Sequence, residues 1–129
     1  MTASDEVHTA TRCPTVLVVD DEPDQLGLIT TFLNREGCTV IAAASGEHAL
    51  SLPPDLPIDL IIVDLLLPGV DGWQLAAELK TRLPGCPVAI TSVLDVQDYP
   101  SAEESLPKPV TRAQIAAILS RHIPDRTCQ

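Results

Sequence analysis

Short runs of branched apolar residues alternate along the chain with stretches in which apolar residues recur at helical spacing. The runs are typical of strands buried on both faces. They cover Thr15 to Asp20, Thr39 to Ala44, Asp59 to Leu65 and Pro87 to Ser92. After Ser92 the pattern weakens, and a small fifth strand is predicted near Glu104 to Leu106.

The stretches between these runs carry the start and stop signals of helices. The start signals are Pro23 in a first turn, Ser45 as a cap, Asp71 with Gln74, and Thr111 with Gln114. Gly37 and the proline-rich residues 53–57 end the first two helices. Strands that alternate with helices in this way predict a doubly wound α/β domain, in which helices cover both faces of a five-stranded parallel sheet.

Polar residues stand where the predicted strands end. Asp20 and Asp21 close the first strand, Asp64 ends the third, Thr91 the fourth, and Lys108 follows the fifth. The carboxyl ends of parallel strands meet at one edge of a sheet, where such folds bind ligands. These side chains are therefore expected to form one site.

Asp64 lies within a run of apolar residues, where an unpaired charge is costly to desolvate. Three carboxylates close together repel one another, and a hard divalent cation such as Mg²⁺ or Mn²⁺ relieves that repulsion. Asp64 would then attack a phosphoryl group, while Thr91 and Lys108 bind its oxygens. An alternative is that Asp20 and Asp21 only cap the first helix and Lys108 makes a surface ion pair.

Four segments together resemble the receiver domain of two-component response regulators. They are VLVVDDEPD, LIIVDLLLPGVDGWQL, PVAITS and LPKP, and the resemblance spans about residues 14 to 122. It implies a flavodoxin-like fold with strand order 2-1-3-4-5. It also implies a phosphoacceptor switch rather than an enzyme.

By this resemblance, Asp64 takes its phosphoryl group from a phosphohistidine on a sensor histidine kinase or a histidine phosphotransfer protein. The implied metal ligands are the side chains of Asp20, Asp21 and Asp64 and the backbone carbonyl of Leu66. Thr91 and Lys108 are implied to contact the phosphoryl group. A cis peptide bond is common in the family between the lysine and the following proline, here Pro109.

The sequence departs from the family after the fourth strand. Only 16 residues separate Thr91 from Lys108, so the fourth helix is expected to be short or missing. Ser105 stands where the family usually places the aromatic switch residue. The readout of phosphorylation is therefore expected to differ from the usual one.

Two apolar residues flank the expected site. Leu66 is two residues after Asp64, and Val93 is two residues after Thr91. A polar side chain at either position could orient a hydrolytic water, whereas these cannot. A comparatively long-lived phosphoryl group on Asp64 is expected.

The remaining features describe the whole chain. Residues 1–13 and 124–129 are expected to be flexible tails around a receiver domain at 14–123. With 8 Lys and Arg against 18 Asp and Glu, the net charge of −10 argues against nucleic acid as a partner. No apolar run is long enough for a membrane span, and no targeting segment is recognised, so a cytoplasmic protein is expected. The four widely spaced cysteines are expected to be reduced thiols.

Three functions fit these observations to different degrees. A stand-alone receiver is expected, because no DNA-binding segment follows residue 123. The first alternative is a receiver-like interaction module that is never phosphorylated. The second is a phosphatase, but its second acid just downstream of the nucleophile is replaced here by Leu65 and Leu66.

Overall fold

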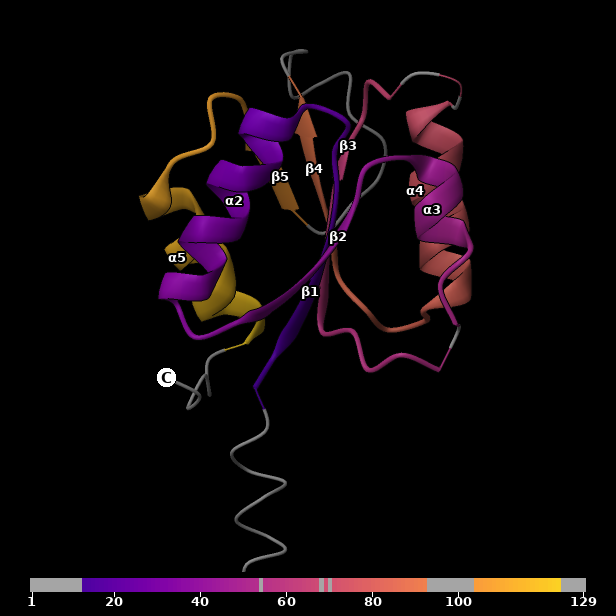
Figure 1. Ribbon diagram of the computed structural model, residues 1–129. Helices are drawn as coiled ribbons and strands as arrows, with labels where there is room; N and C mark the ends of the chain where they lie inside the picture. Colours follow the sequence, from indigo (N-terminus) through magenta and orange to yellow (C-terminus); the bar gives the residue numbers. More distant parts are fainter. Residues whose placement is uncertain (1–12, 54, 68, 70, 93–103, 124–129) are drawn as a thin grey trace, which may run out of the picture.

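The computed structural model describes residues 13–53, 55–67, 69, 71–92 and 104–123 of the 129-residue chain (Figure 1). The described strands are β1 (Thr15–Val19), β2 (Thr39–Ala43), β3 (Leu60–Asp64), β4 (Val88–Ser92) and β5 (Glu104–Pro107). The described helices are α2 (Pro23–Arg35), α3 (Gly46–Leu50), α4 (Gly72–Arg82) and α5 (Arg112–His122). Strands and helices follow the predicted order, with bounds that differ by one or two residues.

The five strands form one sheet in the order β2-β1-β3-β4-β5, and every neighbouring pair is parallel. Helices α2 and α5 lie on one side of the sheet, and α3 and α4 lie on the other (Figure 1). The doubly wound, flavodoxin-like fold is thus confirmed. The predicted shortening of the fourth helix falls on residues 93–103, which lie outside the described part of the chain.

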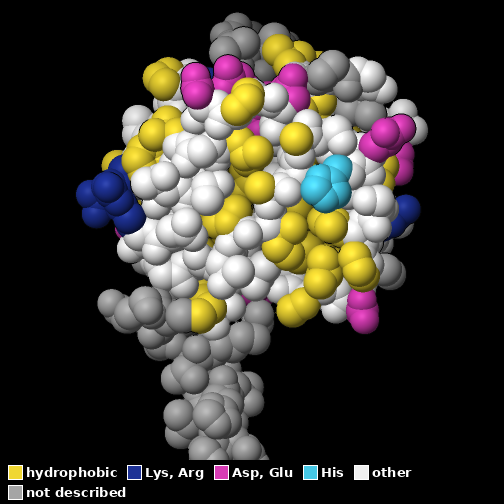
Figure 2. Space-filling model, in the orientation of Figure 1, with side chains coloured by type: hydrophobic (Ala, Val, Ile, Leu, Met, Phe, Trp, Pro, Cys, Tyr) yellow, Lys and Arg dark blue, Asp and Glu magenta, His cyan; other side chains and the backbone are white. Residues whose placement is uncertain are grey.

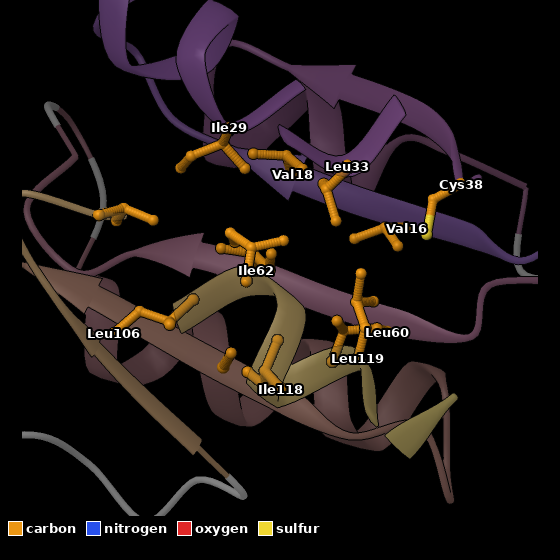
Figure 3. Close-up of a cluster of buried hydrophobic side chains, with 13 residues drawn as sticks. Val16, Val18, Ile29, Leu33, Cys38, Leu60, Ile62, Leu106, Ile118 and Leu119 are labelled. Carbon is orange, nitrogen blue, oxygen red and sulfur yellow. The ribbon is translucent and has the colours of Figure 1, made fainter. Parts of the chain in front are cut away.

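Two hydrophobic cores enclose the sheet, one on each face. Along β1, Val16 and Val18 point into the core beneath α2 and α5, while Leu17 and Val19 point into the core beneath α3 and α4. Figure 3 shows the first of these cores, in which Ile62 of β3 lies between side chains from several elements. Burying one such side chain contributes about 1.5–3 kcal/mol, so strands buried on both faces are held firmly in place. Their carboxyl ends are therefore fixed relative to one another.

Capping side chains begin the helices, mostly as predicted. Ser45 caps α3, Asp71 caps α4, and Thr111 forms a complete capping box with Gln114 at α5. The cap of α2, however, is Glu22, whose carboxylate accepts the amide N–H groups of two residues in the first turn. The alternative in which Asp20 and Asp21 serve as the helix cap is therefore wrong.

The cysteines do not all match the expectation. Cys38 and Cys86 form no disulfide, as predicted, but Cys13 is disulfide-bonded, so the prediction of a reduced thiol is wrong for Cys13. Widely spaced cysteines can still meet in space, and spacing alone does not reveal this. None of the described helices is long and apolar enough to cross a membrane.

Candidate phosphoacceptor site

Four neighbouring strands bring the predicted side chains to one edge of the sheet. Asp20 directly follows β1, and Asp64 is the last residue of β3. The Cα partner of Asp64 on β4 is Thr91. Lys108 directly follows β5 and reaches across to Asp64. The parallel register is what brings together side chains that are distant in the sequence.

The acidic residues of the site lie close together, and two of them are buried. Asp20 is fully buried and Asp64 is 3 % exposed, whereas Asp21 is exposed. One carboxylate oxygen from each of the three lies within 4.8 Å of the others. Oxygen donors at this spacing suit a hard divalent cation, as the sequence predicted.

Backbone amides hold one oxygen of each buried carboxylate. The N–H of Glu22 donates to Asp20 Oδ1 over 2.9 Å, and the N–H of Leu66 donates to Asp64 Oδ1 over 3.0 Å. Asp20 Oδ2 is buried and accepts no hydrogen bond from the described residues. A buried carboxylate oxygen without a hydrogen-bond donor is costly, so an additional positive group at this atom would stabilise the site.

Lys108 is the cation of the site. Its Nζ lies 2.9 Å from Asp64 Oδ2 and 3.7 Å from Asp20 Oδ2. Burial by itself would lower the pKa of Lys108, but the hydrogen bond to Asp64 and the two negative charges outweigh burial and raise it. Lys108 therefore stays charged, and its partners are buried acids, so the alternative of a surface ion pair is wrong.

The pKa of Asp20 shows that burial disfavours the charged form of this carboxylate. Burial raises the pKa of Asp20 above its usual value, against the amide of Glu22 and the charge of Lys108, which lower it. The charges of Asp64 and Asp21 raise this pKa further. A second cation at the three carboxylates would remove this cost.

Thr91 is fully buried on β4, and its hydroxyl has no hydrogen-bond partner among the described residues. A buried hydroxyl of this kind costs stability unless another group satisfies it. Its position beside Asp64 leaves it available to a group carried by that residue.

The loop after Asp64 is held by a close approach between backbones. Leu65 and Leu67 are buried in the core, while Leu66 between them is 49 % exposed. A Cβ atom at Gly72, the first residue of α4, would lie 1.8 Å from the backbone oxygen of Leu65. Gly72 thus positions the loop that carries Leu66. Sequence reasoning missed this role, although the glycine directly after the capping Asp71 was visible.

Comparison with known proteins now places the chain in a family. The family model described as "Response regulator receiver domain" matches residues 16–120. The chain belongs to this family. Receiver domains are phosphoacceptor switches of two-component signalling, and they interact with histidine kinases or phosphotransfer proteins.

Similar receiver sequences occur within longer proteins. The chain is 40 % identical to the response regulator GtcR of Aneurinibacillus migulanus over 78 residues, which cover 60 % of this chain and 32 % of GtcR. It is 32 % identical to the sensor histidine kinase GacS of Pseudomonas protegens, over 88 % of this chain and 14 % of GacS. This receiver domain thus spans less than half the length of either relative.

Solved structures show the same fold. The response regulator TrrA of Thermotoga maritima, determined in complex with Mg²⁺ and BeF, superposes with a TM-score of 0.77 at 26 % identity. The match covers 85 % of this chain and 99 % of TrrA.

The remaining predicted positions of the receiver domain have mixed outcomes. Ser105 lies on β5 opposite Ile90 and is exposed. The Lys108–Pro109 peptide bond is cis, as the family resemblance implied. Val93 lies outside the described residues, so its predicted effect on hydrolysis stays a prediction.

Proposed function

We propose that Asp64 accepts a phosphoryl group from a phosphohistidine of a sensor histidine kinase or histidine phosphotransfer protein, and that this modification switches protein contacts in the cytoplasm. The observation that carries the proposal is the placement of Asp64. Its nearly buried carboxylate lies beside two other acids and 2.9 Å from Lys108 Nζ, at the end of a strand that packing holds in place.

The chemistry is a transfer between two nucleophiles. A carboxylate oxygen of Asp64 forms a P–O bond as the P–N bond to the donor imidazole breaks, and the imidazole leaves with the electron pair and takes up a proton. The amide of Leu66 holds Asp64 Oδ1, so the carboxylate is already oriented before the donor arrives. Orientation of this kind lowers the entropic part of the barrier.

The acidic residues fit a divalent cation, Mg²⁺ or Mn²⁺. Asp20, Asp21 and Asp64 would hold it together with the backbone carbonyl of Leu66, and Asp20 Oδ2 is a buried oxygen that accepts no hydrogen bond from the described residues. The bound cation supplies positive charge for the phosphoryl oxygens. The Mg²⁺ and BeF complex of the similar protein TrrA supports this assignment.

Lys108 and Thr91 would bind the phosphoryl oxygens that the cation does not reach. Lys108 is charged and already contacts Asp64, so it needs only a small shift to follow the new negative charge. The hydroxyl of Thr91 would gain the acceptor that it lacks without phosphate. Phosphorylation would therefore be registered on β4 and β5 at once.

Incubation with acetyl phosphate and Mg²⁺, followed by intact-mass measurement, tests the proposal. We expect one acid-labile phosphoryl group on the wild-type protein, none on Asp64→Asn, and none when the metal is chelated. Asp71→Asn is the matched control, since Asp71 is an exposed helix cap and asparagine caps a helix as well as aspartate does. Absence of phosphate on the wild-type protein would favour the unphosphorylated interaction module, and phosphate retained by Asp64→Asn would place the acceptor elsewhere.

A further inference from the structure

Strand β2 leaves hydrogen-bonding groups unused at one edge of the sheet. The amide of Thr39 donates to Pro14 O over 2.8 Å, and Ala43 O accepts the amide of Asp20 over 3.1 Å. Residues 39, 41 and 43 thus face β1 with their polar backbone groups. Because these groups alternate along a strand, the N–H and C=O of Val40 and Ala42 point away from the sheet. No hydrogen bond between described residues uses them.

The edge also lacks the features that usually prevent pairing. Natural edge strands carry lysine, proline or a bulge that keeps other strands away. The sequence of β2, TVIAA, has no charge and no proline, and its pairing with β1 is regular over all five residues. Figure 2 shows the molecule from the β2 side, and no charged side chain covers the band over β2 between α2 and α3.

We propose that β2 pairs with β2 of a second copy of this chain, antiparallel, with Ile41 on the two-fold axis. The outward groups determine this register. Val40 then lies opposite Ala42 of the other copy, and each pair exchanges two N–H to O=C bonds, which gives four bonds in all. Ile41 meets its own counterpart between the two bonded pairs. The two five-stranded sheets become one continuous sheet.

A second copy suits this edge because the outward donors and acceptors of β2 complement those of an antiparallel copy of β2. A two-fold interface needs one surface to match its own copy, and residues 40 and 42 supply one donor and one acceptor each, placed symmetrically about Ile41. The distribution of charge also favours contact between copies at this edge. A chain with a net charge of −10 repels its copy over most of its surface, and the uncharged β2 edge brings no like charges into contact.

The association is expected to be weak, and salt is expected to strengthen it. A five-residue strand edge is smaller than a standard stable interface, so the dimer should form only at high protein concentration. The remaining negative charges of the two copies still repel at long range. Added salt screens this repulsion and leaves the four hydrogen bonds in place.

Amide exchange measured residue by residue tests the register. From about 10 µM to about 1 mM protein, we expect exchange at Val40 and Ala42 to slow by about tenfold or more as the dimer forms. Ile41 is the internal control, because its amide already faces β1 and is protected in the monomer. Unchanged exchange at Val40 and Ala42 over this range would overturn the proposal.

Sedimentation equilibrium of two lysine variants tests the interface. Ala42→Lys places an exposed charge on the edge, and Ala77→Lys makes the same change at an exposed position of α4. We expect Ala42→Lys to weaken dimerisation by about tenfold or more and Ala77→Lys to behave as the wild-type protein. Ala42→Pro should act like Ala42→Lys, since it removes only an outward N–H. A monomeric wild-type protein at every concentration, or a dimer of equal strength in Ala42→Lys, would refute the pairing.

Discussion

Replacing Gly72 with alanine should disrupt the loop that follows Asp64. The added Cβ would lie 1.8 Å from the backbone oxygen of Leu65, 2.6 Å from its carbonyl carbon and 2.8 Å from its Cα. An ordinary carbon contact begins near 3.4 Å, so α4 and the loop must separate by about 1.6 Å, the difference between 3.4 and 1.8. Backbone atoms of a buried residue cannot rotate out of the way as a side-chain end can.

Overpacking in a core typically costs about 1–3 kcal/mol, and a clash between two backbones belongs at the upper end or beyond. We therefore expect Gly72→Ala to lower the free energy of unfolding by about 3 kcal/mol or more. The separation also displaces Leu66, whose amide orients Asp64, so acceptance of phosphate from acetyl phosphate should slow. Urea unfolding followed by circular dichroism measures the free energy of unfolding, and timed intact-mass measurement gives the rate of phosphorylation.

Gly27→Ala is the matched control. Gly27 lies within α2, and a Cβ there would meet nothing within 4 Å. Alanine in place of a helical glycine should raise the free energy of unfolding by about 0.5–1 kcal/mol. If both variants shift the urea midpoint in the same direction, or if Gly72→Ala unfolds like the wild-type protein, the close approach does not constrain the loop and the reasoning is wrong.

Four further substitutions test the site and its surroundings. Thr91→Val removes a buried hydroxyl without a partner at almost constant volume, so it should raise the free energy of unfolding by about 1 kcal/mol in urea while slowing phosphorylation. Leu66→Asn should shorten the half-life of phosphoryl-Asp64, because the polar side chain can orient a hydrolytic water, and the sequence predicts the same for Val93→Glu. An unchanged half-life in both variants would contradict the idea that these apolar residues slow hydrolysis. Glu104→Gln should lower the free energy of unfolding at neutral pH but not in acid. The hydrogen bonds from Arg121 lower the pKa of Glu104 below its ordinary 4.5, so this stabilisation is complete above that pH and is lost as pH falls through the lowered value. The urea midpoints of the wild-type protein and Glu104→Gln should converge as the pH falls. A difference that stays constant with pH would show that the charge of Glu104 does not stabilise the fold.

Local pattern was enough to predict the strands and helices and their alternation, because the central strands β1 and β3 are buried on both faces and each helix begins at a capping residue, whereas the strand order came from the family resemblance. The acids of the site could be predicted for a related reason, since Asp64 ends an apolar run that leaves no structural purpose for a charge. The cap of α2 could not be predicted, because Asp20, Asp21 and Glu22 can all cap a helix and backbone geometry selects Glu22. The close approach at Gly72 and the disulfide of Cys13 depend on distances between separate segments, which periodicity does not encode.

The ion pair of Asp64 with Lys108 joins residues that are 44 positions apart in the sequence. During synthesis, the acidic residues leave the ribosome well before the lysine does. A chain that ended before Lys108 would lack the ammonium partner of these acids, and it would also lack α5, which covers one face of the sheet. On the proposed function, acceptance of a phosphoryl group by Asp64 would therefore require that nearly the whole domain has been made and folded.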